Sequence, residues 1–487
     1  MLRRARGLAR PRRCDTTGEF EWVSSHDADG LPIGNDVLRR SMDRPLPRKC
    51  IATLSARRRA RWPRAAFVAA SLMLSAFVHA GEPAAYDRGA MMRAVAENWR
   101  ASQQPDGLLP YGFDFLDDRP DDDATSGAYI AREAGAFWVW ARYARAVRDE
   151  RDRDALRRGL EALAARSLPL GKPRGQRFLD GLHVYDAPIG RMTITRGLRR
   201  AGLLYVDQGT AKVVSASGRY DDAWTGATAL ALLTELVYAE ATGEGGFASL
   251  RNAWRDALLA LYVPGRGFRE SPTSIDDDDF ATAEAWLALA AYAASDPADV
   301  RVQHALADLD AALITRFTRH PNTPGFQWSS MAAAQRWATT HDPRFADFLR
   351  EQSRVLRERF ARRIQVDPFA NRCASLEGFA AMRAVLAASS AHADDVAALD
   401  AILRRELARL PRLQIHAGQT RLRLGGDGYL VAPAMSRFAG AFFWNEYRPY
   451  TRIDAAAHCL SALLGIEEGA PSAEATTVKE IASPEVK

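Results

Sequence analysis

The chain has 487 residues, of which 47% are hydrophobic and 26% charged, and it contains 34 Gly, 24 Pro and 4 Cys. This composition is that of a folded globular protein, and it excludes a disordered chain, a collagen and a small disulfide-rich scaffold. The positive charge is concentrated at the N-terminus, because residues 1–80 hold 16 basic and 7 acidic residues whereas the remainder holds 50 and 53. The part of the chain that folds therefore has no basic excess, and we expect no nucleic acid partner.

The first 80 residues have the order of a targeting sequence. A basic flank at 57–64 precedes an apolar stretch of about 14 residues, and Val78-His79-Ala80 supplies the small residues that a signal peptidase needs. The apolar stretch is short for a membrane-spanning helix, so a retained signal anchor is the second choice. We expect 1–41 to be a disordered extension or an over-extended gene start, and 42–80 to be a signal peptide cleaved after Ala80. The protein would then be periplasmic or secreted, without a stable membrane span.

From residue 86 onward, apolar residues recur at helical spacing in twelve segments. The last segment has no following partner and the first has no preceding one, so pairing these two closes six helical hairpins into a ring. The sequence therefore predicts an all-α (α/α)6 toroid as a single domain over 81–467, followed by a disordered tail at 468–487. The predicted helices are 86–103, 126–148, 150–167, 219–242, 247–262, 280–294, 299–319, 326–340, 343–362, 371–390, 393–411 and 452–465.

The links within each hairpin are short, whereas several links between hairpins are long. They span about 50 residues at 168–218, about 17 at 263–279 and about 40 at 412–451. In a toroid of alternating inner and outer helices, all these long links emerge at the rim where the inner helices begin. Long loops on one face of a rigid scaffold are where binding sites are usually built. Alternating apolar and polar residues in the two longest links also predict short β-hairpins at this rim.

Three of the hairpins resemble those of the six-hairpin glycosidase superfamily, the (α/α)6 toroids of glycoside hydrolases and their lyase and epimerase relatives. They are YDDAWTGATALALLTELVYAEATGE, FATAEAWLALAAYAASDP and FQWSSMAAAQRWATTHDPRFADFLREQ. The resemblance covers residues 86–467, and the YDDAW segment is similar to the paired-aspartate segment of some (α/α)6 mannan hydrolases. It implies a carbohydrate-active enzyme, first of all a glycoside hydrolase acting on a poly- or oligosaccharide, with its site at the rim where the inner helices begin. The residues themselves fit hydrolysis without a cofactor best.

Polar and aromatic residues from six hairpins fall at that rim. Cleavage of a glycosidic bond needs one carboxylic acid that protonates the leaving oxygen and one carboxylate that attacks carbon or activates water. The predicted catalytic residues are Asp221, Asp222, Glu284, Glu377, Asp454 and His458. The predicted substrate-binding residues, which include aromatic rings able to stack on sugars, are Arg132, Glu133, Tyr220, Trp224, Gln327, Trp328, Arg372, Trp444, Tyr447 and Arg452.

Each of these residues also has a structural explanation, and the sequence leaves both open. Asp221 and Asp222 precede a helix and could cap it. Glu284 and Glu377 lie inside helices, where a buried carboxylate could simply belong to an ion pair. A histidine on an apolar helix is usually a core residue, but His458 follows Asp454 by four residues and so shares its helical face.

Three further features concern ligands. If Arg132, Arg372 and Arg452 all face the opening, they favour an anionic sugar such as a uronate, because guanidinium binds carboxylate in a bidentate way. The run 276–279 of four aspartates is either a solvated capping stretch or a stretch that attracts calcium, and it lacks the spaced ligands of an EF-hand. We predict no metal site. Cys373 and Cys459 either pair or remain two buried thiols.

Other functions fit parts of the sequence. A lyase or uronyl epimerase on the same fold would use His458 with Tyr447 or Tyr450 to exchange the proton next to a uronate carboxyl. A non-enzymatic scaffold of helical hairpins would need tighter and more regular links than these. A terpene-type cyclase is suggested by the acidic run 276–279, but the predicted export argues against it. The sequence does not indicate an oligomeric state.

Overall fold

The computed structural model describes residues 87–121, 127–170, 210–274, 276–321, 325–361, 372–423, 429–445 and 448–468. The chain separates into two units, Met1–Gly81 and Glu82–Lys487, and all the described residues belong to the second unit. The predicted extension and signal peptide lie outside the described residues, as does the predicted C-terminal tail except for Glu468, which is the last residue of a helix. Among the helices that are described, none is long and apolar enough to cross a membrane.

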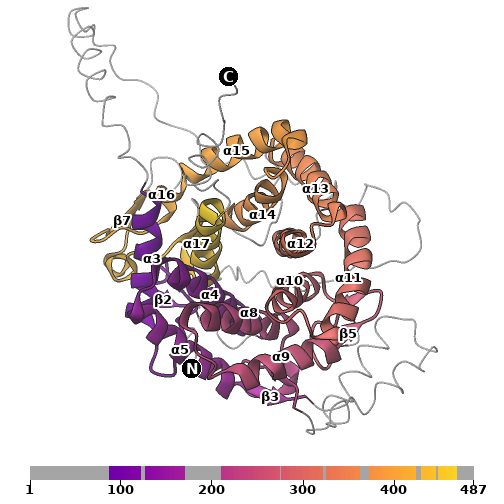
Figure 1. Cartoon of the computed structure of the whole chain (residues 1–487). Coiled ribbons are helices and arrows are strands. Elements are labelled where there is room, and N and C mark those ends of the chain that lie inside the picture. The colour runs from indigo at the N-terminus through magenta and orange to yellow at the C-terminus, as the bar shows by residue number, and fades with distance from the viewer. Residues whose placement is uncertain are drawn as a thin grey trace, which may run out of the picture. The chain divides into compact units, whose positions relative to one another are not determined.

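Six inner helices of the described chain form a closed ring. Each packs against the next, and the last packs against the first (Figure 1). Twelve of the 18 residues of the second and twelve of the 17 residues of the third are buried, because an inner helix is in contact with protein on most sides. The inner helices are α4 (Gly127–Val147), α8 (Thr225–Thr242), α10 (Asp279–Ser295), α12 (Phe326–Thr340), α14 (Arg372–Leu386) and α17 (Ile453–Glu468).

Six outer helices in the same described ranges surround this ring. They bury one apolar stripe against their inner partners and expose charged residues on the other side, as in α5, where Leu156, Leu160 and Leu163 are buried. Helix α3, which comes first in the chain, packs on α17, which comes last. The outer helices are α3 (Arg88–Ser102), α5 (Glu150–Ala165), α9 (Ala248–Leu261), α11 (Val300–Arg319), α13 (Pro343–Ala361) and α15 (Ala393–Leu407). The predicted (α/α)6 toroid, including its closure, is confirmed.

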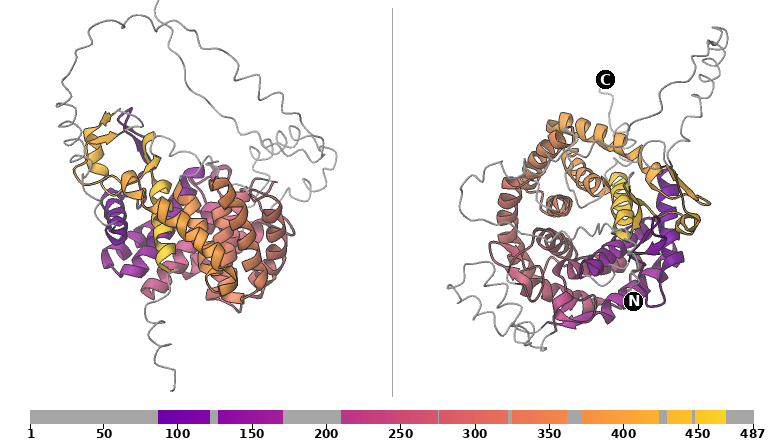
Figure 2. Two further views of the ribbon diagram at one scale, coloured as in Figure 1. Left: turned by 90° about the horizontal axis from the view of Figure 1, so that it is seen from above. Right: turned by 180° about the vertical axis from the view of Figure 1, so that it is seen from behind.

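Short strands lie in the links that precede inner helices, and Figure 2 shows a group of them beyond one end of the helical layer. An antiparallel sheet with the order β2-β1-β10-β9 combines β1 (Gly112–Asp114) and β2 (Arg119–Pro120) with β9 (Phe443–Asn445) and β10 (Arg448–Arg452). Because β10 runs directly into α17 and pairs with β1 from the link before α4, the sheet connects the N-terminal ends of two neighbouring inner helices.

Three two-stranded hairpins complete the described strands. They are β3 (Ser167–Pro169) with β4 (Lys212–Val214), β5 (Tyr262–Val263) with β6 (Gly267–Phe268), and β7 (Arg421–Arg423) with β8 (Tyr429–Val431). The hairpin predicted within 412–451 is thus confirmed. Most of the other long link, residues 171–209, lies outside the described residues.

Buried ion pairs between neighbouring helices account for two of the acids. Asp152 on α5 accepts hydrogen bonds from Arg100 and from the indole nitrogen of Trp140, the latter at 3.0 Å. Asp310 on α11 is held in the same way by Trp286 at 2.9 Å and by Arg336 at 2.8 Å. These carboxylates have all their partners inside the wall of the toroid, so we assign them to stability rather than to a site.

Cys373 and Cys459 form a disulfide, with an S–S distance of 2.02 Å and their Cα atoms 4.7 Å apart. The bond links α14 to α17, two neighbouring inner helices that are far apart in sequence. It settles the choice that the sequence left open between a disulfide and two thiols.

Candidate active site

Asp454 lies at the centre of a group of charged side chains where α17 begins. Arg452 donates from Nε to its Oδ1 at 2.6 Å and from a second nitrogen to Oδ2, and Nε of Arg132 lies 3.3 Å from Oδ2. The residue is only 7% exposed. Burial alone would raise the pKa of Asp454, but Arg452 first, then Arg132 and His458, lower it below its usual value. Asp454 is therefore ionised at neutral pH.

Aromatic rings hold Arg452 in place. Its guanidinium lies 3.9 Å from the ring centre of Trp444 and 5.8 Å from that of Tyr111. Arg132 lies 5.5 Å from the same Tyr111 ring and donates to the Tyr111 hydroxyl. Arg452 therefore lies against one face of the Trp444 ring, and stacking of a sugar on this ring stays a prediction.

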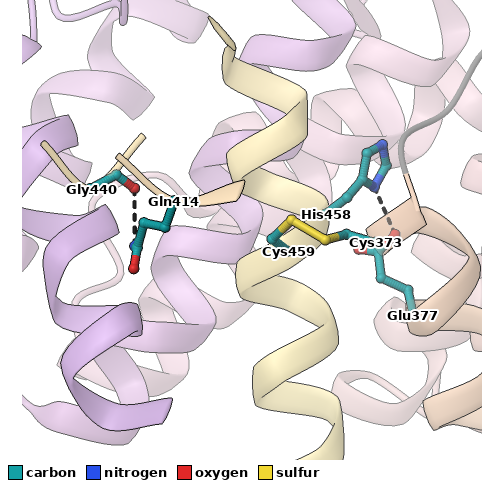
Figure 3. Close-up of a disulfide and its surroundings, with 6 residues drawn as sticks. All are labelled: Cys373, Glu377, Gln414, Gly440, His458 and Cys459. Carbon is teal, nitrogen blue, oxygen red and sulfur yellow. Dashed lines mark hydrogen bonds and ion pairs between the residues drawn. A yellow bond between two sulfur atoms is a disulfide. The ribbon is translucent and has the colours of Figure 1, made fainter. Parts of the chain in front are cut away.

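His458 and Glu377 form the second pair of the group. Nδ1 of His458 lies 2.7 Å from Oε2 of Glu377, and Figure 3 shows the other ring nitrogen pointing away from Glu377. Burial lowers the pKa of His458, but the charges of Glu377 and Asp454 raise it further than burial lowers it. The Trp328 ring lies 6.2 Å from the imidazole. The second oxygen of Glu377 is buried and has no hydrogen-bond partner among the described residues.

Glu284 lies in the second turn of α10 and is 9% exposed. Its carboxyl group occupies the space beside Gly226 on α8, where a Cβ atom would stand 1.9 Å from Oε2. Burial raises its pKa to about 8, the negative charge of Asp278 adds to the increase, and Arg132 opposes it. Glu284 is therefore mostly a neutral carboxylic acid at pH 7.

Arg132 connects the two reactive candidates. Its charge lowers the pKa of both Asp454 and Glu284, so both carboxyl groups lie within its electrostatic reach. The three side chains come from α17, α10 and α4, which are separated by long stretches of sequence. Acid–base chemistry on a sugar requires two carboxyl groups in different protonation states, and the pKa values of Glu284 and Asp454 are shifted in opposite directions.

The aspartate pair before α8 has other contacts. Asp222 accepts hydrogen bonds from the hydroxyls of Ser215, at 2.5 Å, and of Ser217. Tyr220 donates from its hydroxyl to the carbonyl of Pro169 at 2.6 Å. These bonds tie the short 3-10 turn η2 (Tyr220–Asp222) to the β3–β4 hairpin. No contact between described residues joins Asp222 to Asp454 or Glu284. The side chain of Asp221, and Tyr447 as a whole, lie outside the described residues.

Within the described residues, no ion pair or hydrogen bond joins four other predicted substrate-binding residues to Asp454, and their role in binding stays a prediction. Arg372, 48% exposed, donates to Glu406 on the outer helix α15 at 2.7 Å. Buried Glu133 accepts from the backbone nitrogen of Leu109, and burial raises its pKa to about 8. Trp224 stands at the N-cap of α8 and packs against the core. Gln327 is buried on α12, and its Oε1 has no hydrogen-bond partner among the described residues.

The acidic run before α10 is engaged by cations and backbone. Asp277 binds Arg316 at 2.5 Å and also Arg266, and Asp279 binds Arg316. Asp278 caps α10 by accepting from the backbone nitrogen of Ala281 at 2.8 Å. Throughout the described ranges, no group of three or more His, Cys, Asp or Glu residues could hold a metal ion. Three of the four acids therefore have partners within the chain.

Tyr111 and Gly226 contact the site but are not among the site residues predicted from the sequence. Tyr111 lies in an irregular link and carries no pattern that would have distinguished it. Gly226 did carry a signal, because glycine inside a helix costs stability and so often indicates the close approach of another group. In this fold the approaching group is the Glu284 carboxyl.

No family model and no curated protein sequence matches the chain. Among solved structures, the α-1,6-mannanase GH76A of Salegentibacter sp. HEL1_6 is similar over 79% of this chain and 100% of its own, with 7% identity and a TM-score of 0.48. An inactive variant of that mannanase with α-1,6-mannotriose has 8% identity and the same coverage and TM-score. An unsaturated glucuronyl hydrolase specific for heparin is similar over 78% of this chain and 97% of its own, with 11% identity and a TM-score of 0.46. Each likeness concerns the overall fold alone, so function has to be inferred from the side chains.

Proposed function

We propose that this protein is a glycoside hydrolase in which Glu284 is the general acid and Asp454 the catalytic carboxylate. The observation that carries the proposal is the opposite protonation of two buried carboxyl groups near one arginine, with the pKa of Glu284 raised to about 8 and that of Asp454 lowered. A purely structural pair would be expected to be ionised and matched with cations. A buried neutral acid that shares the electrostatic influence of one arginine with a buried ionised carboxylate instead costs stability and is typical of catalytic sites.

In the proposed reaction, Glu284 transfers its proton to the glycosidic oxygen as the bond between that oxygen and the anomeric carbon breaks. Asp454 either stabilises the positive charge that develops on the anomeric carbon or attacks that carbon as a nucleophile. Water supplies the hydroxyl that ends on this carbon, and its remaining proton restores Glu284. Arg132 helps to keep Asp454 ionised, and the charge of Arg132 also acts on Glu284. The chemistry requires only carboxyl groups and water, so we propose no cofactor.

The charge balance of the site favours an anionic sugar. Arg132 and Arg452 are opposed by the carboxylate of Asp454, while Glu284 is neutral, which leaves one positive charge in excess among these four groups. The Arg132 side chain is 29% exposed, so its guanidinium can also contact a ligand. We therefore propose a poly- or oligosaccharide that contains uronate units as the substrate.

Two observations make a lyase or epimerase a weaker candidate. The pKa of His458 is raised, which favours the protonated imidazole, and a protonated imidazole cannot accept a proton from carbon. Burial and the bond to Asp121 raise the pKa of the Tyr450 phenol, which keeps the phenol protonated and neutral.

The other two alternatives are also weaker. A passive scaffold would have no need of an unpaired neutral acid. A terpene-type cyclase would depend on the acidic run 276–279, but Asp277 and Asp279 in that run are already bound by Arg316.

We also propose that the protein is exported, because residues 57–80 have the basic, apolar and small-residue order of a signal peptide. Cleavage after Ala80 would leave Gly81 at the N-terminus of the exported protein. The mass of the protein recovered from outside the cytoplasm tests this, and a mass equal to that of the uncleaved chain would count against it.

The function is tested by incubating the protein with a panel of uronate-containing and neutral oligosaccharides. We expect new reducing ends without ultraviolet absorbance, and faster cleavage of the uronate-containing members. An absorbing, unsaturated sugar end would identify a lyase instead. If no member is cleaved by the wild type more rapidly than by the Glu284→Gln variant, the proposed hydrolase is wrong.

Gly226→Ala should disable the site without removing a charged group. The new Cβ would stand 1.9 Å from Oε2 of Glu284, so the carboxyl must move. We expect kcat to fall roughly 10²-fold, because displacing a reacting group by about 1 Å has an effect of that size. Gly135→Ala on α4 is the matched control, since its Cβ would meet Leu230 at an ordinary 3.5 Å. Equal kcat values for the two variants would show that Glu284 does not need its observed position.

A further inference from the structure

The disulfide lies next to the charged group of the site. Cys459 directly follows His458 on α17, and Cys373 precedes Glu377 by one turn of α14. Figure 3 shows the S–S bond and the His458–Glu377 pair crossing the same gap between these two helices. One covalent bond and one charged hydrogen bond therefore join α14 to α17 within a single turn of each other.

Neighbouring residues on a helix point about 100° apart, so Cys459 and His458 cannot face the same direction. Cys459 is 1% exposed and lies in the interface with α14, whereas the His458 side chain is 13% exposed. The helical backbone between the two residues is rigid, and the same is true of the single turn from Cys373 to Glu377. A fixed separation of the two cysteines is therefore transmitted to the imidazole and the carboxylate.

We infer that the Cys373–Cys459 disulfide is a positioning element of the site, which fixes the spacing of α14 and α17 so that Glu377 holds His458 against Asp454. The inference rests on the proposed function only in treating Asp454 as reactive. Neither cysteine is a catalytic residue, because both act through His458 and Glu377.

The charges around His458 show why its position matters. It faces Glu377 from α14, Asp454 from its own helix and Arg452 from β10, and the uncharged ring of Trp328 from α12. Glu377 is the strongest of the influences that favour the protonated imidazole, and it acts through a 2.7 Å contact. In turn, the charge of His458 contributes to lowering the pKa of Asp454. A longer separation between α14 and α17 would weaken the contact of Glu377 with His458, and a less protonated His458 would then lower the pKa of Asp454 less.

The test is an NMR titration of the His458 imidazole, with its signal assigned by its absence in His458→Gln. The full chain is compared with the Cys373→Ala/Cys459→Ala double variant. We expect the pKa of His458 to be lower in the double variant, because the contact with Glu377 loosens while the burial remains. This measurement needs no substrate, so its outcome is independent of whether the proposed hydrolase activity is found.

Leu306→Ala on the outer helix α11 is the matched control. Leu306 is buried, so its truncation costs about 2–5 kcal/mol of stability, comparable to the loss of a disulfide, and α11 packs on α9, α10 and α13 rather than on α14 or α17. We expect the His458 titration of this variant to match that of the wild type. If the double variant and the wild type titrate alike, or if Leu306→Ala shifts His458 as much as the double variant does, the inference is wrong.

Should the double variant fail to fold, the same titration is made on the native protein reduced with a phosphine. Reduction of the disulfide must then release two more thiols than are present before treatment. A lower pKa of His458 in the reduced protein supports the inference, and an unchanged pKa overturns it.

Discussion

Replacing Glu284 with glutamine should lower sugar cleavage by about 10²–10⁴-fold, the usual contribution of a general acid. The same change should increase stability at alkaline pH. Folding raises the pKa of Glu284 from 4.5 to about 8, so the native state keeps a proton that the unfolded chain has lost. The stability of the wild type therefore falls as the pH rises from about 4.5 to about 8, by an amount on the order of a few kcal/mol, and glutamine removes this loss.

Denaturant unfolding from acidic to alkaline pH, together with kcat, measures both effects. Glu235→Gln is the matched control, because Glu235 is also buried on an inner helix but binds Arg251 on the outer helix α9 at 2.7 Å. We expect Glu235→Gln to lose stability and keep its kcat, which is the opposite of the result for Glu284→Gln. A Glu284→Gln variant that retains wild-type kcat would remove Glu284 from the mechanism.

Replacing Asp454 with asparagine should reduce both activity and stability. The carboxylate is buried between two arginines, so its loss leaves Arg452 without its bidentate partner, at a cost of about 3–5 kcal/mol. We expect kcat to fall roughly 10³-fold, because no other ionised carboxylate lies against Arg132 within the described residues. Chemical unfolding and kcat at neutral pH measure the two losses.

The stability difference between the wild type and Asp454→Asn should depend on pH in the opposite direction from the stability difference between the wild type and Glu284→Gln. Folding lowers the pKa of Asp454 below 3.8, so its contribution is present above that value and disappears as the pH falls through the lower folded value. The stability difference between wild type and Asp454→Asn should therefore shrink only under strongly acidic conditions. A difference that is already absent at neutral pH would contradict the ion pair.

Asp152→Asn is the matched control for Asp454→Asn. Asp152 is as deeply buried, and it binds Arg100 and Trp140 in the wall of the toroid away from the site. We expect a comparable loss of stability with little change in kcat. If both variants lose kcat equally, the effect of Asp454→Asn comes from general destabilisation rather than from chemistry.

The candidate site was only partly predictable. The sequence predicts Glu284, Glu377, Asp454 and His458 as site residues because each places a polar group near the start of an apolar inner helix. The sequence could not distinguish them from Asp222, which the structure holds with two serine hydroxyls, nor from Arg372, which turns toward Glu406 on α15. The direction of a side chain at a helix start depends on the neighbouring helix, and that neighbour is usually distant in sequence.

The sequence by itself determined the twelve helices, their pairing into hairpins and the closure of the ring, because helix periodicity and link length are local properties that can be read along the chain. Only the tertiary structure decided which acids meet. The protonation of Glu284 depends on its burial beside Gly226, and that of Asp454 on Arg452 and Arg132. Burial and charge pairing are set by contacts between α4, α8, α10, α14 and α17, and no local pattern specifies such contacts.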